Sequence, residues 1–164
     1  LAAQHLIDKG HKNLMFRTFR YPGSPDSEPM GPKWSYHWGV YTGIRKALDE
    51  AGLDTSRSLV LSTGSDTDRG LSCGLSGLDG VICMADFMAK KIYDLAEKEG
   101  RKIGVDLGVV GFFDTPWATL MSPSLTSVSV DETEIARLAV KTLEERRKGL
   151  TLLVPPKLKT RESA

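Results

Sequence analysis

The sequence contains little cysteine and little histidine. Its two cysteines, Cys73 and Cys83, are ten positions apart and form no CxxC pair. Neither has the spacing to His5, His11 or His37 that a zinc site requires. We therefore expect no resident metal, and two reduced thiols of the kind found in cytoplasmic proteins.

Long apolar runs and an excess of one charge are also missing. No apolar stretch approaches the roughly twenty residues that a membrane-spanning helix needs, and residues 1–5 show no secretory leader. Lys and Arg total 22 against 21 Asp and Glu. A net charge of +1 gives no electrostatic argument for binding nucleic acid or an anionic membrane. Because the chain starts at Leu1 rather than Met, we expect it to begin inside a longer protein.

The motifs of the common catalytic sites are absent as well. The sequence contains no GxxxxGK[ST] phosphate loop, no GxGxxG after a strand, no GxSxG elbow and no HExxH helix. The three histidines are not clustered, which favours a structural role for them. We therefore expect no enzymatic activity, no catalytic residue and no cofactor.

What the sequence does contain is 164 residues with a 40% hydrophobic share, enough for one domain with a real core. Apolar residues at helical spacing alternate with short apolar runs typical of strands covered on both faces. The expected helices cover residues 1–9, 34–51, 86–99 and 131–149, with a weaker one over 66–75. The expected strands are 14–19, 58–61, 80–84 and 107–112. Strands separated by helices predict an α/β fold with a mostly parallel sheet flanked by helices.

Local signals refine three places in this pattern. Asp86 is a good N-cap for the helix that follows it, and Asp131 with Glu134 resembles a capping box. Residues 20–33 hold four of the eight prolines and predict an irregular loop, either a functional lid or a surface insertion.

Parallel sheets also predict where a ligand binds. In an open parallel sheet, ligands lie outside the carboxyl ends of the strands. Trp34, Tyr36 and Trp38 lie near the first of these ends in the sequence, and Trp117 follows the last. Aromatic side chains around a crevice suit the face of a sugar ring or of a planar molecule. Ordinary packing of the same rings is the alternative.

Six segments are similar, in the same order, to those of one protein family. They are residues 2–11, 43–52, 80–89, 108–114, 122–128 and 155–163. No single segment is decisive, but six in order, ending on Pro-Pro-Lys-Leu-Lys-Thr-Arg-Glu-Ser, are specific. By these segments the chain resembles the ligand-binding and dimerisation module of LacI/GalR-type bacterial transcription regulators.

The resemblance implies a type I periplasmic-binding-protein-like fold, in which two α/β subdomains are joined by three crossing segments around a ligand cleft. By that pattern, residues 1–19 and 125–150 are remnants of a largely missing N-terminal subdomain, and residues 20–124 and 151–164 form the C-terminal subdomain. The apolar helix faces that carry Leu6 and Leu138 are then expected to lack their packing partners.

The resemblance also places a ligand site on eight residues. They are Trp34, Tyr36, Val40, Ser65, Ala85, Asp86, Phe113 and Asp114. Three of these are apolar where the family carries polar residues: Val40 replaces an Arg, Ala85 an Asn and Phe113 an acid. Losing a bidentate Arg and its carboxylate partner removes hydrogen bonds that a sugar requires. We expect a less polar pocket, suited to an atypical effector, to a larger saccharide read by stacking, or to no effector.

The function implied is that of an effector-binding and dimerisation module of a cytoplasmic DNA-binding regulator. A small molecule in the cleft would control operator binding through a headpiece outside this chain. The homodimer interface is expected on Phe87, Met88, Ile92 and Tyr93. The alternative is an extracytoplasmic solute- or sugar-binding protein of the same fold, acting as a transport receptor.

Overall fold

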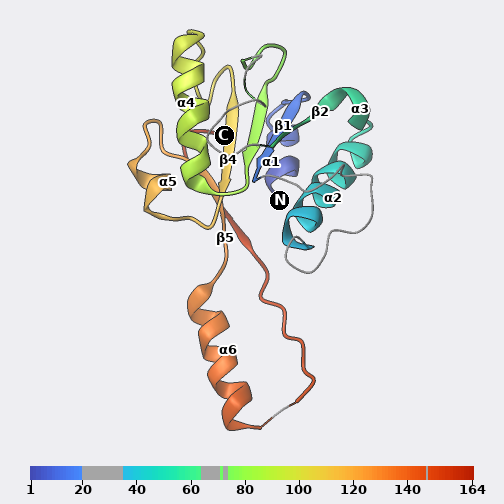
Figure 1. Cartoon of the computed structure of the whole chain (residues 1–164), viewed down its shortest axis with the longest axis vertical. Helices are drawn as coiled ribbons and strands as arrows, with labels where there is room; N and C mark the ends of the chain where they lie inside the picture. The colour runs from blue at the N-terminus through green and yellow to red at the C-terminus, as the bar shows by residue number, and fades with distance from the viewer. Residues whose placement is uncertain (20–34, 64–70, 72–73, 147) are drawn as a thin grey trace.

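A six-stranded sheet forms the centre of the molecule, in the order β2-β1-β3-β4-β5-β6 (Figure 1). The computed structural model describes residues 1–19, 35–63, 71, 74–146 and 148–164. Neighbouring strands from β2 to β5 are parallel, and β6 runs antiparallel to β5. The strands are β1 (Leu14–Thr18), β2 (Leu59–Thr63), β3 (Gly80–Cys83), β4 (Gly108–Phe112), β5 (Thr126–Ser129) and β6 (Lys157–Lys159). The prediction of a mostly parallel sheet flanked by helices is confirmed.

Helices lie on both sides of this sheet. Figure 1 shows α4 on one side and α1 with α2 on the other. The helical segments are α1 (Ala2–Asp8), α2 (Ser35–Glu50), α3 (Thr55–Ser58), the 3-10 turn η2 (Asp86–Met88), α4 (Ala89–Lys98), α5 (Pro116–Leu120) and α6 (Glu132–Glu144). The short helices α3 and α5 were not expected. The expected loop at 20–33 and most of the expected helix at 66–75 lie outside the described residues.

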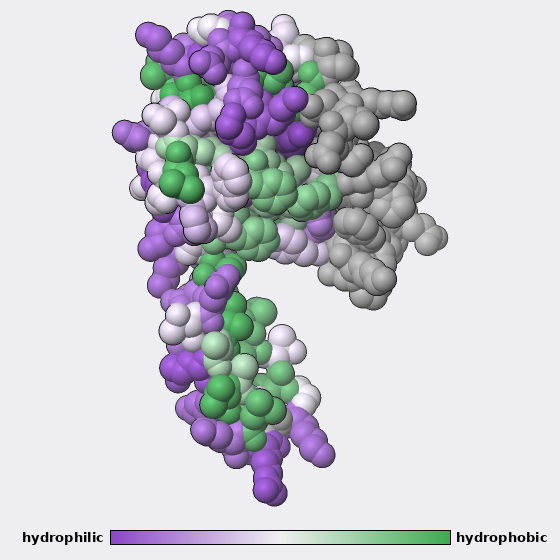
Figure 2. All heavy atoms as spheres, turned by 60° about the vertical axis from the view of Figure 1, so that its left-hand side comes forward, coloured by the Kyte–Doolittle hydropathy of each residue, from purple (hydrophilic) through white to green (hydrophobic). Residues whose placement is uncertain are grey.

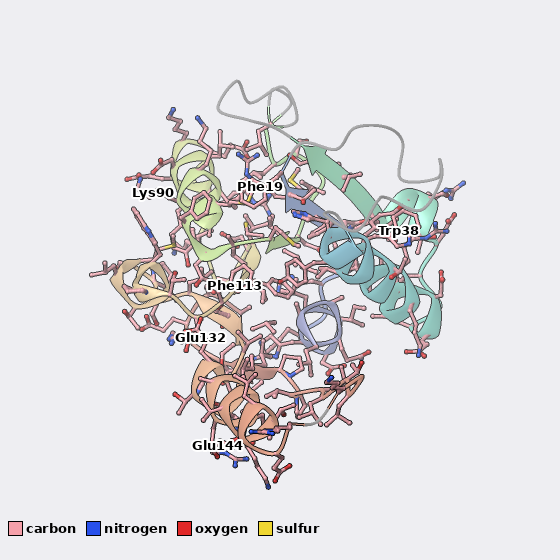
Figure 3. All side chains as sticks on the ribbon, turned by 60° about the horizontal axis from the view of Figure 1, so that its bottom comes forward. Phe19, Trp38, Lys90, Phe113, Glu132 and Glu144 are labelled. Atoms are coloured by element: carbon pink, nitrogen blue, oxygen red, sulfur yellow. The ribbon has the colours of Figure 1, made fainter. Side chains whose placement is uncertain are left out.

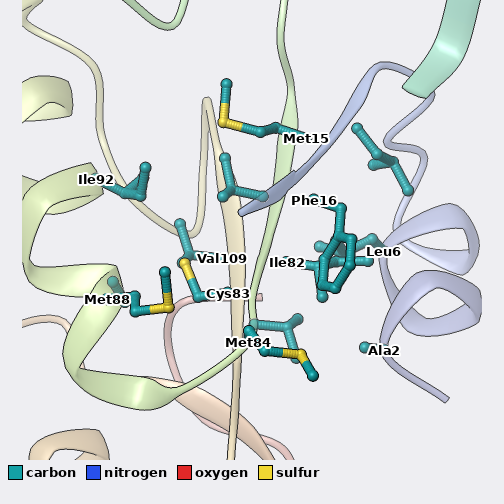
Figure 4. Close-up of a cluster of buried hydrophobic side chains, with 14 of the residues drawn as sticks. Ala2, Leu6, Met15, Phe16, Ile82, Cys83, Met84, Met88, Ile92 and Val109 are labelled. Atoms are coloured by element: carbon teal, nitrogen blue, oxygen red, sulfur yellow. The ribbon is translucent and has the colours of Figure 1, made fainter. Parts of the chain in front are cut away.

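Apolar residues on both faces of the central strands explain why the sheet is covered twice. All five residues of β1 and all four of β3 are buried. Because side chains alternate along a strand, Met15 points toward α4 while its neighbour Phe16 points toward α1 (Figure 4). Ile92 of α4 and Leu6 of α1 close the two halves of the core, both fully buried.

The position of β1 corrects the expected division of the chain. β1 is hydrogen-bonded between β2 and β3, so residues 1–19 belong to the same sheet as the strands that follow. The expectation that Leu6 lacks a partner is wrong, because its side chain packs in the main core with 0% exposure. Residues 1–19 are therefore part of the body formed by residues 35–124, rather than a remnant of another subdomain.

Helix α6 is arranged differently, since it projects away from the sheet on the two segments that follow β5 and precede β6 (Figure 1). Its predicted cap is confirmed: the Asp131 carboxylate accepts a hydrogen bond from the Glu134 amide over 3.0 Å. None of its residues is buried. Its apolar face, with Ile135 and Leu143, borders a groove of about 570 Å³ against residues 150–154, and hydrophobic surface is visible on this arm in Figure 2.

Candidate functional site

The carboxyl ends of β1, β3 and β4 bring five rings together at one edge of the sheet. Phe19 follows β1, Phe87 lies in η2 just after β3, and Phe113 follows β4. Tyr36 and His37 come from the first turn of α2. Figure 3 shows Phe19 and Phe113 in the central part of the molecule, between α4 and α2. We call these five residues the aromatic wall.

The rings of the wall form a continuous chain of contacts. Phe87 lies 6.0 Å from Phe19, and Phe19 lies 5.8 Å from His37, measured between ring centroids. His37 is 5.9 Å from Tyr36, which in turn is 5.9 Å from Phe113. These separations lie in the range of favourable tilted and edge-to-face pairs. All four of the Phe and Tyr rings nevertheless keep between 39% and 49% of their surface exposed, so the wall faces outward rather than completing the core.

The polar groups of the wall carry no charge at neutral pH. Burial lowers the pKa of His37 below its ordinary value of 6.5, and its Nδ1 lies 2.7 Å from the Thr18 hydroxyl. Burial also raises the pKa of Tyr36 to about 12, so its phenol stays protonated. The wall is therefore a neutral aromatic surface.

Asp86 lies beneath this surface and is fully buried. One carboxylate oxygen accepts hydrogen bonds from the Thr115 amide, over 2.6 Å, and from the Thr115 hydroxyl, over 2.8 Å. The other accepts a hydrogen bond from the Ser127 hydroxyl over 2.6 Å. The expected role of Asp86 as a helix N-cap is wrong, because Ala85 occupies the cap position and the carboxylate turns toward β4 and β5 instead. Asp86 thus holds the loop after β4 in place.

That loop also has an unusual backbone. Phe113 and Asp114 have φ angles of 89° and 50°, in the left-handed region that favours glycine. The conformation is held by hydrogen bonds from the Phe113 amide to the Val128 carbonyl, over 2.8 Å, and from the Asp114 amide to the Ser127 hydroxyl, over 3.0 Å. Asp tolerates these angles, but for the bulky Phe113 they are strained, and such strain concentrates at functional sites.

The carboxylate of Asp114 is paired with Arg161, which reaches it from the C-terminal tail over 2.6 Å. The same guanidinium donates to the Leu125 carbonyl over 2.8 Å. Both side chains of the pair are about one-fifth exposed. The tail therefore fixes the site from behind, and neither group is left to face a ligand as an uncompensated charge.

The structure brings only part of the predicted ligand site together at this surface. Tyr36 and Phe113 are in contact, and Asp114 is adjacent. Val40 is partly buried and packs against the core, and Ala85 is buried. Asp86 lies below the surface, as described, and Trp34 and Ser65 lie outside the described residues. Phe19 and His37 were not expected at the site, although Phe19 ends a predicted strand and His37 lies near the start of a predicted helix.

The predicted dimer residues also separate into two groups. Met88 and Ile92 are part of the core, so they offer no surface to a second chain, and that part of the prediction is wrong. Tyr93 is half-buried and donates its hydroxyl to the Pro123 carbonyl over 2.9 Å. Phe87 is exposed but belongs to the aromatic wall. Between α4 and α5 lies a groove of about 560 Å³, whose rim includes the exposed Leu120.

Two kinds of feature are absent from the described part of the chain. Among those residues, no three His, Cys, Asp or Glu side chains are grouped so that they could hold a metal ion. None of the described helices has the length and apolar character needed to cross a bilayer.

Solved structures share this fold. The cellobiose complex of the transcriptional regulator CelR is 24% identical with a TM-score of 0.73, and covers 99% of this chain and 50% of its own. A LacI family regulator from Enterococcus faecium with bound ribose is 22% identical with a TM-score of 0.74, and covers 99% of this chain and 60% of its own.

Curated relatives include transcription repressors by name. The ribose operon repressor of Haemophilus influenzae is 27% identical over 175 residues, which cover 99% of this chain and 49% of the relative. Catabolite control protein A of Priestia megaterium is 29% identical over 148 residues, 87% of this chain and 42% of the relative. The chain spans about half the length of the curated relatives it matches.

These relatives confirm the resemblance to LacI/GalR-type regulators, and none of those described is named as an enzyme. The model of the periplasmic binding protein-like domain matches residues 3–164, nearly the whole sequence. The chain therefore belongs to the periplasmic binding protein-like domain family.

Proposed function

We propose that the chain is the effector-binding and dimerisation module of a LacI-type DNA-binding transcription regulator, and not an enzyme. The observation that carries this proposal is the aromatic wall, because it lies outside the carboxyl ends of parallel strands, where ligands bind in open α/β sheets. The family match over residues 3–164 and the name of the ribose operon repressor support it.

The arm formed by α6 and residues 150–154 is evidence that a second subdomain packs against it. Its groove exposes apolar residues such as Leu143, at 77%, and Leu153, at 88%. Exposed apolar surface of this extent marks an interaction site. Because the chain spans about half of its relatives, we assign the occupant of this groove to the remainder of the same polypeptide, folded as the partner subdomain.

In this arrangement, the segments on either side of α6 are the connections between the two subdomains. Lys157, just at the start of β6, lies 3.8 Å from the Asp131 carboxylate across these two segments. An effector bound between the subdomains stabilises one relative orientation over the other, and this difference in affinity shifts the population. The shift reaches operator DNA in the cytoplasm through a headpiece outside this chain.

The homodimer surface is proposed on the groove between α4 and α5. The groove borders the half-buried Tyr93, and Leu120 on its rim is 77% exposed. A two-fold contact of this surface with itself would bury both apolar rims. This assignment keeps α4, the element expected from the sequence. It makes Tyr93 and Leu120 the contact residues in place of the buried Met88 and Ile92.

The test is operator binding by the full-length protein. Sedimentation gives its oligomeric state, and fluorescence anisotropy with DNA from upstream of its own gene gives its affinity. We expect a dimer that binds a palindromic site with a strong dependence on salt. A monomer without affinity for DNA contradicts the proposal and favours the solute-binding alternative. Leu120→Glu should weaken the dimer, with exposed Val60→Glu on β2 as a matched control.

A further inference from the structure

The aromatic wall also indicates which chemical class of effector it accepts, and this inference rests on the proposed function. The rings come from four separate parts of the chain and are joined edge to face or tilted rather than stacked flat. Tyr36 and Phe113 meet at 36°, whereas Tyr36 and Phe112 meet at 83° with centroids 6.5 Å apart. The rings therefore lie at varied angles to one another rather than in one plane.

The acidic groups near the wall are already engaged by the protein. The Asp86 carboxylate is buried and accepts three hydrogen bonds from Thr115 and Ser127. The Asp114 carboxylate is held by Arg161. A polyhydroxylated ligand needs a partner for every hydroxyl that it buries, because an unpaired buried polar group costs free energy. Asp86 already accepts three hydrogen bonds, and Arg161 occupies one oxygen of Asp114, so these two carboxylates leave few acceptor sites for the hydroxyls of a saccharide.

Charge gives a second restriction on the ligand. His37 is neutral at pH 7, since burial lowers its pKa, and Tyr36 is protonated. The Arg161 guanidinium beside Phe113 is neutralised by Asp114. The rings of the wall therefore present no counter-charge of their own, whereas Glu132 and Lys159 lie with Phe113 around a neighbouring pocket of about 520 Å³.

We propose that the effector is a neutral, planar aromatic molecule with few polar groups. Such a ligand adds one more ring to the existing chain of contacts, packing its face or its edge against Tyr36, Phe113 and Phe19. Aromatic pairs of this kind are favourable at centroid separations of 4.5–7 Å, which the wall already uses between its own members. Shape and stacking then provide the selectivity that hydrogen bonds provide for a sugar.

The experiment measures ligand binding to the full-length protein by saturation-transfer NMR with two sets of probes. Indole and quinoline are the neutral aromatic probes, and glucose, ribose and cellobiose are the saccharide probes. We expect saturable binding of the aromatic probes alone. Phe113→Gly and Tyr36→Ala should each weaken it at least fivefold. Phe113→Gly is a mild substitution for the fold, because glycine readily adopts the φ of 89° found there.

The control is Trp38→Ala. The sequence grouped Trp38 with Tyr36, but its ring contacts Tyr41 rather than the wall, and it lies well apart from Phe113 in Figure 3. This variant should bind indole as the wild type does. Saccharide binding without aromatic binding overturns the ligand class, and so does aromatic binding that the two wall variants leave unchanged. Absence of binding by every probe overturns it too. The DNA-binding and sedimentation measurements decide the proposed function separately, so the two failures are distinguishable.

Discussion

The Ser127 hydroxyl donates a hydrogen bond to the Asp86 carboxylate over 2.6 Å, joining the turn after β3 to the strand β5 two positions further across the sheet. The bond passes beside Gly111 of β4, whose missing side chain leaves room for it. Because Ser127 also accepts the Asp114 amide, this one contact connects the buried network to the strained loop that carries Phe113. The geometry of the aromatic wall therefore depends on residues that do not belong to its surface.

Replacing Asp86 should destabilise the fold more than replacing any single partner. Asp86→Ala leaves the Thr115 amide, the Thr115 hydroxyl and the Ser127 hydroxyl without their acceptor. We expect a loss of about 3 kcal/mol in the free energy of unfolding, since a stranded buried donor costs roughly 1–3 kcal/mol and the Thr115 donors are only partly buried. Ser127→Ala removes one of these bonds and should lose about 1 kcal/mol. Urea unfolding measures both, and equal losses would contradict the role given to Asp86.

A methyl group at Gly111 should have a similar effect by crowding. A Cβ there would collide with the Asp86 carboxylate and would lie 2.9 Å from Leu125 and 3.2 Å from the Asp86 backbone. We expect Gly111→Ala to cost about 1–3 kcal/mol, the usual range for overpacking. The matched control is Gly43→Ala in α2, where nothing lies within 4 Å. There, higher helix propensity should stabilise the protein by up to about 1 kcal/mol. Thermal unfolding measures both variants, and a lower Tm for both would contradict the assignment of the effect to crowding at Gly111.

Local sequence signals predicted the elements that depend on local chemistry. The apolar run that starts at Gly80 predicted the buried strand β3, and the capping residue Asp131 predicted the start of α6. In contrast, β5 and β6 were not predicted, and β6 is only three residues long with Leu158 as its one partly buried residue. It is a strand because it pairs with β5 across about thirty residues of sequence, with Val128 opposite Leu158. Such pairing has no local signature.

The candidate site likewise combines residues that the sequence could identify with contacts that depend on the order of the strands. Phe113 was assigned because the family resemblance places it at a ligand position, whereas Phe19 and Phe87 meet 6.0 Å apart only because β1 lies next to β3 in the sheet. The order of strands is not written in hydrophobic periodicity. For the same reason, the expected separation of residues 1–19 from the main body could not be corrected before the sheet order was known.

The C-terminal tail should contribute measurably to stability through Ser163. Its hydroxyl donates to the Val109 carbonyl over 2.6 Å and accepts the Thr126 amide over 2.8 Å, with the side chain fully buried. Ser163→Ala leaves both partners unsatisfied, and we expect a loss of about 2 kcal/mol in the free energy of unfolding. Exposed Ser76→Ala is the control and should change it by less than about 0.5 kcal/mol. Equal free energies of unfolding for the two variants in urea would show that the tail contributes nothing to stability.

Stability should fall on mild acidification because of His11. Burial is the main cause that lowers its pKa below 6.5 in the folded state, opposed by the charge of Asp79 and reinforced by His5 and Lys9. The unfolded chain then binds the proton at a higher pH than the folded chain does, so this contribution is complete above pH 6.5 and is lost as the pH falls through and below that value. His11→Asn should show a smaller decrease in Tm between pH 7.5 and pH 5.5. Parallel Tm profiles for the two proteins would contradict this linkage.

For α6, the same substitution is expected to have different costs in this chain alone and in a polypeptide that also contains the partner subdomain. In the chain alone, Leu143 is 77% exposed, so Leu143→Ala should change the free energy of unfolding by less than about 0.5 kcal/mol. Leu107→Ala, at a fully buried position, should cost about 2–5 kcal/mol in the same assay. If a partner subdomain covers the groove of α6 in the longer polypeptide, Leu143→Ala becomes a core substitution there and should cost about 2 kcal/mol or more. A cost that stays near zero in both contexts would show that this groove remains uncovered, and the assignment of its occupant would then fail.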